Sequence, residues 1–199
     1  MTGLALIYAE GALDLVAAQK LMRSLGISLE GATLIDTHGR GGFWQRAPKY
    51  EQTARHNGPV FGLTDLDRDE CAPRLLAAKL RHFPHARNAL RIAVRALESW
   101  MLADRNAIAG FMRVSGRRIP ADPDALDDPK VELVNVARHS KRRSIRADMV
   151  PQLGTSGKVG AGYEPRMREF IVNAWEPRRA AINSPSLRKA IAAVQRVTA

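Results

Sequence analysis

The sequence has only one cysteine, Cys71, among its 199 residues. A single cysteine cannot form an intramolecular disulfide and cannot build a cysteine-rich zinc site. No segment approaches the roughly 20 apolar residues that span a bilayer, and the first residues, MTGLALIYAEG, lack the basic region and cleavage site of a signal peptide. We therefore expect a cytoplasmic protein without membrane contacts, in which Cys71 has a packing role.

Acidic residues are in deficit: the chain has 20 Asp plus Glu against 31 Lys plus Arg, which gives a net charge of +11. The excess is uneven, because residues 1–100 carry a net +3 and residues 101–199 a net +8. Such a bias favours an anionic partner, most simply nucleic acid. The alternative is a basic protein that has no polyanionic ligand.

Four short apolar runs predict strands, and helical periodicity follows most of them. The strands are expected at 4–9, 32–36, 59–64 and 89–94, and helices at 10–25 with Gly26 as the stop, 73–83, 98–114, 165–175 and from Pro185 onward. Strands that alternate with helices predict an α/β fold with a mainly parallel sheet flanked by helices.

The alternating pattern stops near residue 115. We expect residues 1–115 to form the α/β core, and residues 116–199 to form a helical C-terminal extension packed on the same domain. The first part of that extension, 116–162, is rich in Pro, Gly, Asp and Arg and predicts a basic, loop-rich insertion.

Acidic side chains follow two of the predicted strands. Glu10 comes after the first strand, and Asp65, Asp67 and Asp69 follow the third at alternate positions. Ligands of parallel sheets collect at the carboxyl ends of strands, and an extended backbone would point alternate side chains the same way. Crowded carboxylates favour a hard divalent cation, Mg²⁺ or Mn²⁺. The alternative is that Asp69 or Glu70 caps the next helix.

The segment around Glu10, Gly11 and Asp14 resembles the first motif of the Toprim domain, which topoisomerases, primases and the OLD-family nucleases share. The second Toprim motif is an apolar strand that ends in DxD, and VFGLTDLD supplies Asp65 and Asp67. The resemblance implies a Toprim-like fold in which Glu10 is a general base or metal ligand and the two aspartates are metal ligands.

Longer blocks of the chain resemble a bacterial Toprim-like family that is often encoded beside an AAA-type ATPase. This resemblance implies an ATPase partner and a role in phage defence. The resemblance to OLD-type nucleases further implies that Glu98 is a ligand of a second metal and that Lys158 is the lysine near the metals, although Glu98 could equally cap its helix. The blocks are ALESWMLADRNAIAGF, DDPKVELVNVARHSKRR, DMVPQLG, REFIVNAW and SPSLRKA.

Basic and glycine-rich segments are candidates for phosphate contacts. The glycine-rich loop at 154–163 could present Lys158 and Tyr163 to a substrate, but it lacks the spacing of a Walker A motif. The turn GRGG at 39–42, with Arg40, could cradle a phosphate or be a plain connection. The cluster RHSKRRSIR is either a nucleic-acid contact or a solvated face; its basic residues are Arg138, Lys141, Arg142, Arg143 and Arg146.

These observations predict a metal-dependent nuclease of the Toprim type. A non-catalytic Toprim-like module that binds nucleic acid or an ATPase and regulates it is the alternative. Primase-like chemistry lacks the accessory regions that primases carry, and the chain is too short for the tyrosine-bearing domain of a topoisomerase.

Overall fold

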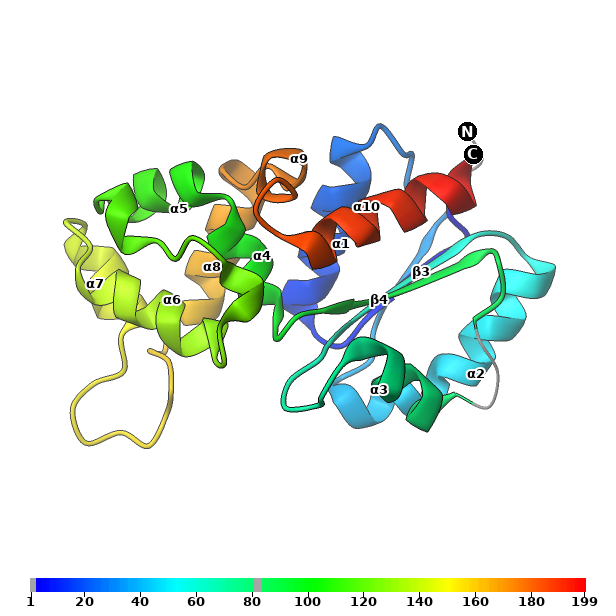
Figure 1. Ribbon diagram of the computed structural model, residues 1–199, viewed down its shortest axis with the longest axis horizontal. Helices are drawn as coiled ribbons and strands as arrows, with labels where there is room; N and C mark the ends of the chain where they lie inside the picture. The colour runs from blue at the N-terminus through cyan, green and yellow to red at the C-terminus, as the bar shows by residue number, and fades with distance from the viewer. Residues whose placement is uncertain (1–2, 81–83) are drawn as a thin grey trace.

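Four strands form one parallel sheet in the computed structural model, which describes residues 3–80 and 84–199 (Figure 1). Their order is β2-β1-β3-β4, and each neighbouring pair is parallel. All four strands lie where the apolar runs predict them, so the predicted α/β fold with a parallel sheet is confirmed. The strands are β1 (Leu6–Ala9), β2 (Thr33–Asp36), β3 (Val60–Asp65) and β4 (Asn88–Ala93).

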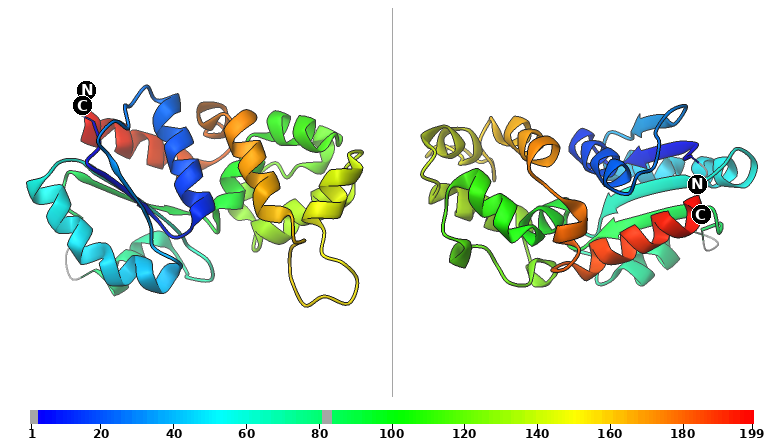
Figure 2. Two further views of the ribbon diagram at one scale, coloured as in Figure 1. Left: turned by 180° about the vertical axis from the view of Figure 1, so that it is seen from behind. Right: turned by 90° about the horizontal axis from the view of Figure 1, so that it is seen from above.

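Helices cover both faces of the sheet (Figure 2). Because side chains alternate along a strand, Leu6 and Tyr8 of β1 face α2 (Arg40–His56), whereas Ile7 and Ala9 face α1 (Ala12–Ser24). The helix α3 (Ala72–Lys79) joins the α2 side, and α10 (Pro185–Thr198) packs against β4 on the α1 side. Phe83, expected at the end of the third helix, lies outside the described residues.

Helix α1 ends as its sequence predicts. Gly26 has φ 74°, a left-handed conformation that glycine adopts without steric cost. Its N–H bonds the carbonyl of Arg23, and the N–H of Ile27 bonds that of Met22. This pair of bonds closes the helix and turns the chain towards β2.

A helical lobe lies beyond the carboxyl ends of the strands (Figure 1). The prediction of a loop-rich segment at 116–162 is wrong in part, since two helices form there. One of them starts where Asp128 accepts a hydrogen bond from the N–H of Val131 at 3.0 Å and Pro129 takes the first position. The helices of the lobe are α4 (Leu97–Ala103), α5 (Arg105–Met112), α6 (Pro129–Arg138), α7 (Arg143–Met149), α8 (Tyr163–Asn173) and α9 (Pro177–Ala180).

The single helix predicted over 98–114 is broken at Asp104, which separates α4 from α5. The Asp104 side chain is fully buried and accepts two hydrogen bonds from the Arg179 guanidinium, at 2.6 and 2.8 Å. It also accepts the N–H of Glu176 at 2.8 Å. These long-range contacts fix a break that helical periodicity alone does not reveal.

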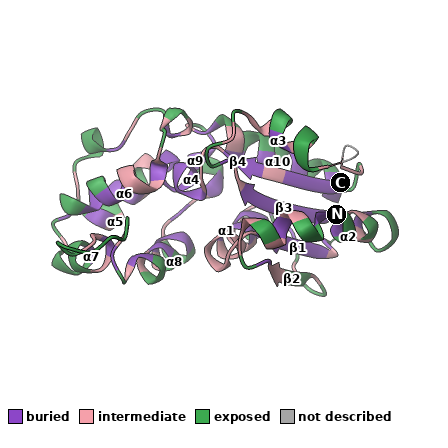
Figure 3. Cartoon of the chain, turned by 90° about the horizontal axis from the view of Figure 1, so that it is seen from below, coloured by how far each residue is buried: buried purple, intermediate pink, exposed green. Residues whose placement is uncertain are grey.

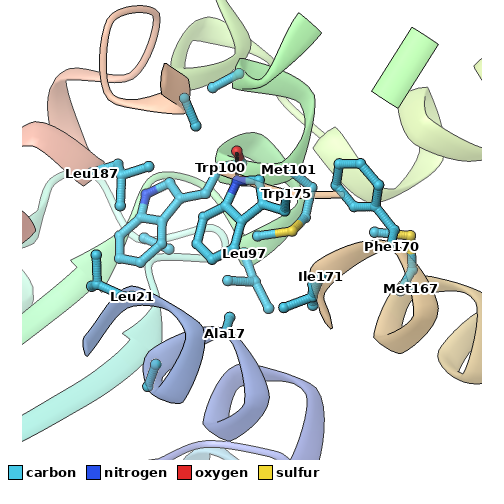
Figure 4. Close-up of a cluster of buried hydrophobic side chains, with 14 of the residues drawn as sticks. Ala17, Leu21, Leu97, Trp100, Met101, Met167, Phe170, Ile171, Trp175 and Leu187 are labelled. Carbon is cyan, nitrogen blue, oxygen red and sulfur yellow. Dashed lines mark hydrogen bonds between the residues drawn. The ribbon is translucent and has the colours of Figure 1, made fainter. Parts of the chain in front are cut away.

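The position of residue 115 does not divide the structure in space. Helices α4 and α5, which precede it, lie in the helical lobe, whereas α10 returns to the sheet (Figure 2). One hydrophobic core runs through both parts, where Ala17 and Leu21 of α1 meet residues of α4 and α8 (Figure 4). The Trp100 indole N–H donates to Ser186 Oγ at 2.8 Å, and that of Trp175 donates to the Trp100 carbonyl at 3.1 Å.

Burial is deepest in the inner strands and least at the β2 edge (Figure 3). Strands β1 and β3 are almost wholly buried, while Leu34 of β2 is 41% exposed. Within the described ranges no helix is long and apolar enough to cross a bilayer.

Replacing Gly62 by alanine should destabilise the sheet. A Cβ atom there would lie 2.3 Å from Tyr8 Cζ, and the Tyr8 ring is fully buried against Phe43 and Tyr50. We expect urea denaturation of Gly62→Ala to show a loss of about 2 kcal/mol or more in the free energy of unfolding. Gly110→Ala is the control: Gly110 is exposed in α5 with no atom near its Cβ position, so this change should be neutral or slightly stabilising. Equal effects of the two changes would contradict the packing argument.

Candidate active site

Carboxylates from three strand ends meet at one edge of the sheet. Glu10 follows β1, and Asp65 is the last residue of β3. Glu10 Oε2 accepts a hydrogen bond from Thr64 Oγ1 at 2.6 Å, and Asp65 Oδ1 accepts the N–H of Leu97 at 2.9 Å. The second of these bonds ties the end of β3 to the start of α4, where Glu98 lies in the first turn.

Asp14, in the first turn of α1, completes a group of four acids. Burial, followed by the charges of Glu98 and Glu10, raises the pKa of Asp14 to about 7. Burial also raises the pKa of Asp65 well above its usual value, with further contributions from Asp14, Glu98 and Glu10. We call Glu10, Asp14, Asp65 and Glu98 the acid cluster. Their mutual repulsion is the electrostatic signature of a site that favours added positive charge.

Glu98 is the most deeply buried member of the acid cluster, with only 3% of its surface exposed. Its Oε1 accepts a hydrogen bond from the Tyr163 hydroxyl at 2.9 Å and lies 3.4 Å from Lys130 Nζ. Burial and the neighbouring Glu98 carboxylate raise the pKa of Tyr163, so the phenol stays protonated as the donor. The N-cap of α4 is Ala96, so Glu98 is not the capping residue.

Lys130 is a charged residue of the site that sequence reasoning did not single out. Burial acts to lower its pKa, but Glu98, Asp65 and Asp14 outweigh that effect and raise it. The ammonium group therefore stays charged beside the acid cluster. The DDPK start of a capped helix places Lys130 in the first turn of α6, but this local pattern does not show that the lysine faces the acids.

Lys158, the lysine that the sequence suggested, binds elsewhere. Its Nζ lies 2.8 Å from Oδ2 of Asp128. Asp128 also caps α6 by accepting the N–H of Val131. Burial acts to raise the pKa of Asp128, but the hydrogen bonds from Lys158 and from the Val131 N–H outweigh it, and the pKa is lowered. Lys158 thus lies at the start of the helix that carries Lys130, and Tyr163 joins the site through Glu98.

The three alternate aspartates after β3 do not point the same way, because the extended backbone ends at Asp65. Asp67 has φ 53°, a left-handed conformation that is uncommon outside glycine. Its Oδ2 lies 2.6 Å from Arg40, and Asp69 binds the same guanidinium. Arg95 donates to the carbonyl of Asp69 at 2.7 Å, which fixes this turn.

The alternative capping role of Asp69 and Glu70 is not observed. The N-cap of α3 is Cys71, no side chain caps that helix, and Glu70 pairs with Arg74 in an exposed contact. Cys71 is half-buried, which agrees with a packing role.

The expected GRGG loop is the first turn of a helix, since α2 begins at Arg40. A Cβ atom on Gly42 would lie 2.0 Å from the Thr37 carbonyl oxygen, so this glycine serves close backbone packing. Arg40, predicted to contact phosphate, pairs with the two aspartates described above.

The basic segment is divided between packing and exposed charge. Arg142 lies over the Phe111 ring at 5.2 Å, donates to the Phe111 carbonyl at 3.2 Å and lies 3.6 Å from Glu169. It therefore holds the α6–α7 corner against α5. The side chains left exposed are those of Arg138, Lys141, Arg143 and Arg146.

The donor set of the acid cluster suits Mg²⁺ or Mn²⁺ in its chemistry. All of its ligand atoms are carboxylate oxygens. The pKa values of Asp14 and Asp65 are raised, first by burial and then by the charges of the neighbouring acids, and a cation would relieve that repulsion. Among the described residues, however, no three acidic, histidine or cysteine side chains already hold the geometry of a metal site. Metal binding would therefore require these side chains to change rotamer, and Lys130 supplies the positive charge in this arrangement.

Comparison with solved structures places the fold in a known class. The C-terminal region of the Burkholderia pseudomallei OLD protein matches all of this chain and is itself wholly covered, with a TM-score of 0.51 and 17% sequence identity. The fold is accordingly of the α/β, Toprim-like type that the sequence predicts. No protein-family model and no curated protein sequence matches the chain.

The raised pKa of Asp14 predicts that stability falls with rising pH. The folded state keeps this proton up to about pH 7, whereas the unfolded chain loses it near its usual value, about 3.9. The folded state therefore binds more protons across that window, and the free energy of unfolding decreases as the pH rises through it. Asp14→Asn should flatten this slope and be the more stable protein at pH 8, measured by urea denaturation in EDTA. Parallel pH profiles for the two proteins would contradict the assignment.

Proposed function

We propose that the protein is a magnesium- or manganese-dependent nuclease of the Toprim type, which hydrolyses phosphodiester bonds of nucleic acid. The single observation that supports this most is the acid cluster: four carboxylates and one lysine, at the ligand-binding edge of a parallel sheet. A structural core needs no such concentration of partly buried charge.

Glu10, Asp65, Asp67 and Glu98 are the residues that would hold the metal, with Asp69 at the margin. A bound divalent cation would supply a Lewis acid for the phosphoryl oxygens and lower the pKa of a water molecule. To bind the metal, Asp67 and Asp69 would have to give up their ion pairs with Arg40.

The other residues of the site act on protons and charge. Asp14 has a pKa of about 7 and can accept or release a proton near neutral pH, and Glu10 is the alternative base. Lys130 places a fixed positive charge beside the acids, where it would stabilise the negative charge that develops on a phosphoryl group. Tyr163 keeps Glu98 in one orientation through its hydrogen bond.

The charge of the chain fits a nucleic-acid substrate. The net charge is +11, and basic side chains are exposed on the helical lobe that borders the acid cluster. Lys158 and the exposed residues Arg138, Lys141, Arg143 and Arg146 are the proposed backbone contacts.

An AAA-type ATPase partner and a role in phage defence belong to the proposal through the family resemblance of the sequence blocks. The loop that carries Lys158 lacks the Walker A pattern, so ATP hydrolysis would come from the partner.

Asp65→Asn should abolish metal-dependent cutting. The substitution keeps the side chain's size but removes a charge at the centre of the acid cluster, so we expect loss of cleavage of labelled plasmid, single-stranded DNA and structured RNA in Mg²⁺ or Mn²⁺. Glu70→Gln is the matched control, because Glu70 is exposed and pairs with Arg74 outside the cluster. Cleavage by the wild type in EDTA would refute the assignment. So would cleavage by Asp65→Asn in Mg²⁺ or Mn²⁺.

The two lysines can be told apart by kinetics. Lys130→Met should lower kcat on the order of 100-fold, the usual effect of removing one electrostatic stabiliser of the transition state. Lys158→Met should mainly raise KM if Lys158 contacts the backbone only. A large fall in kcat for Lys158→Met with Lys130→Met near wild type would give the catalytic role to Lys158.

A non-catalytic regulatory module is the second candidate, favoured by the pairing of Asp67 and Asp69 with Arg40. In that case Glu10→Gln would leave nucleic-acid or ATPase binding unchanged, and neither protein would cut any substrate.

A further inference from the structure

A basic pocket lies at the end of α5, separate from the acid cluster. Its volume is about 580 Å³, and none of its six lining residues, all in the described part of the chain, is acidic. The lining residues are Arg113, Val114, Ser115, Arg118, His139 and Lys141.

Arg113 occupies a position where glycine is the usual residue. It ends α5 with φ 50° and ψ 50°, and its N–H bonds the carbonyl of Gly110 while the N–H of Val114 bonds that of Ala109. This pair of bonds forms a Schellman motif, in which the left-handed residue is most often glycine because a Cβ atom is strained there. Glycine would relieve this strain, so an arginine at this position is a candidate for a side chain with a role other than stability.

The wall of the pocket is held in place by side chains that do not line it. Ser140 Oγ donates to the carbonyl of Met112, and Arg142 donates to that of Phe111 at 3.2 Å. The last carbonyls of α5 are therefore tied to the corner between α6 and α7. This bracing holds the backbone of Arg113 in place, and His139 and Lys141 line the same pocket.

Helix α6 connects this pocket to the acid cluster. Lys130 lies in its first turn and His139 directly follows its last residue. Nine residues of helix correspond to about 14 Å. Successive phosphates of one strand advance about 3.4 Å along the axis of a duplex, so 14 Å measured along that axis corresponds to about four nucleotides.

We propose that the basic pocket binds a phosphate group of the nucleic-acid backbone, at a second contact a few nucleotides from the acid cluster. This rests on the proposed function for the identity of the polymer, but it requires no catalysis. The four basic side chains match an anion, and the size of the pocket admits a phosphate with its sugar.

The test is binding of labelled DNA and RNA oligonucleotides, single-stranded and duplex, by fluorescence anisotropy in EDTA over a range of salt concentrations. Arg118→Ala/Lys141→Ala should weaken binding roughly tenfold and lower the slope of log affinity against log salt by about one, the effect of losing one phosphate contact. Lys189→Ala is the control that removes one exposed positive charge from α10, outside the pocket, and it should match wild type.

Arg113→Gly separates binding from folding. The change relieves the left-handed strain, so we expect the thermal midpoint to rise by about 2 °C or more. The same variant should lose affinity and about one unit of salt slope. A more stable protein that binds worse is a result that damage to the fold cannot produce.

Three results would overturn the inference. The first is unchanged affinity of Arg113→Gly for the oligonucleotides. The second is a loss of affinity in Lys189→Ala equal to that of Arg118→Ala/Lys141→Ala. The third is competition by free AMP at the phosphate concentration of the oligonucleotide, which would make the pocket a nucleotide site. Wild type that binds without cutting in Mg²⁺ would refute the proposed nuclease and leave this inference standing. If wild type cuts and Arg113→Gly binds as well as wild type does, the nuclease proposal stands and this inference is refuted.

Discussion

The buried carboxylate of Glu98 is the constraint on which the rest of the structure depends. A carboxylate removed from water costs several kcal/mol unless a charge and hydrogen bonds compensate it. Here the compensation comes from Lys130 of α6 and Tyr163 of α8, which are far from Glu98 in the sequence. One charged group on α4 thus fixes two further helices against the edge of the sheet.

The same arrangement explains why the helical lobe borders the ligand-binding edge. Hydrophobic packing between α1, α4 and α8 holds the helical lobe against the sheet domain, as Figure 4 shows. Packing of this kind is not directional, whereas the contacts of Glu98 are. Burial and the charges of the neighbouring acids raise the pKa values of Asp14 and Asp65, so the site has a stability cost that a purely structural edge would avoid. The αL backbone of Asp67, beside this edge, is a second cost of the same kind.

The sequence predicted the sheet well, and it predicted that Glu10 and Asp65 follow neighbouring strands, because both features depend on local patterns. A buried parallel strand is a short apolar run, and the acids directly follow such runs, as Glu10 and Asp65 do. The break at Asp104 escaped prediction because it depends on Arg179, 75 residues away. Lys130 escaped for the same reason: its partner Glu98 belongs to another helix, and nothing local distinguishes it from an exposed lysine. The prediction that Asp65, Asp67 and Asp69 point the same way was wrong because it assumed an extended backbone throughout, whereas the strand ends at Asp65.

The most direct test of the central claim is calorimetric titration of the protein with Mn²⁺ and Mg²⁺, comparing wild type with Glu10→Gln. The account predicts saturable binding by wild type and a loss of at least tenfold in affinity for the variant, with circular dichroism showing that both proteins are folded. Absence of binding by folded wild type, or equal binding by the two proteins, would contradict the claim that the acid cluster is a metal site.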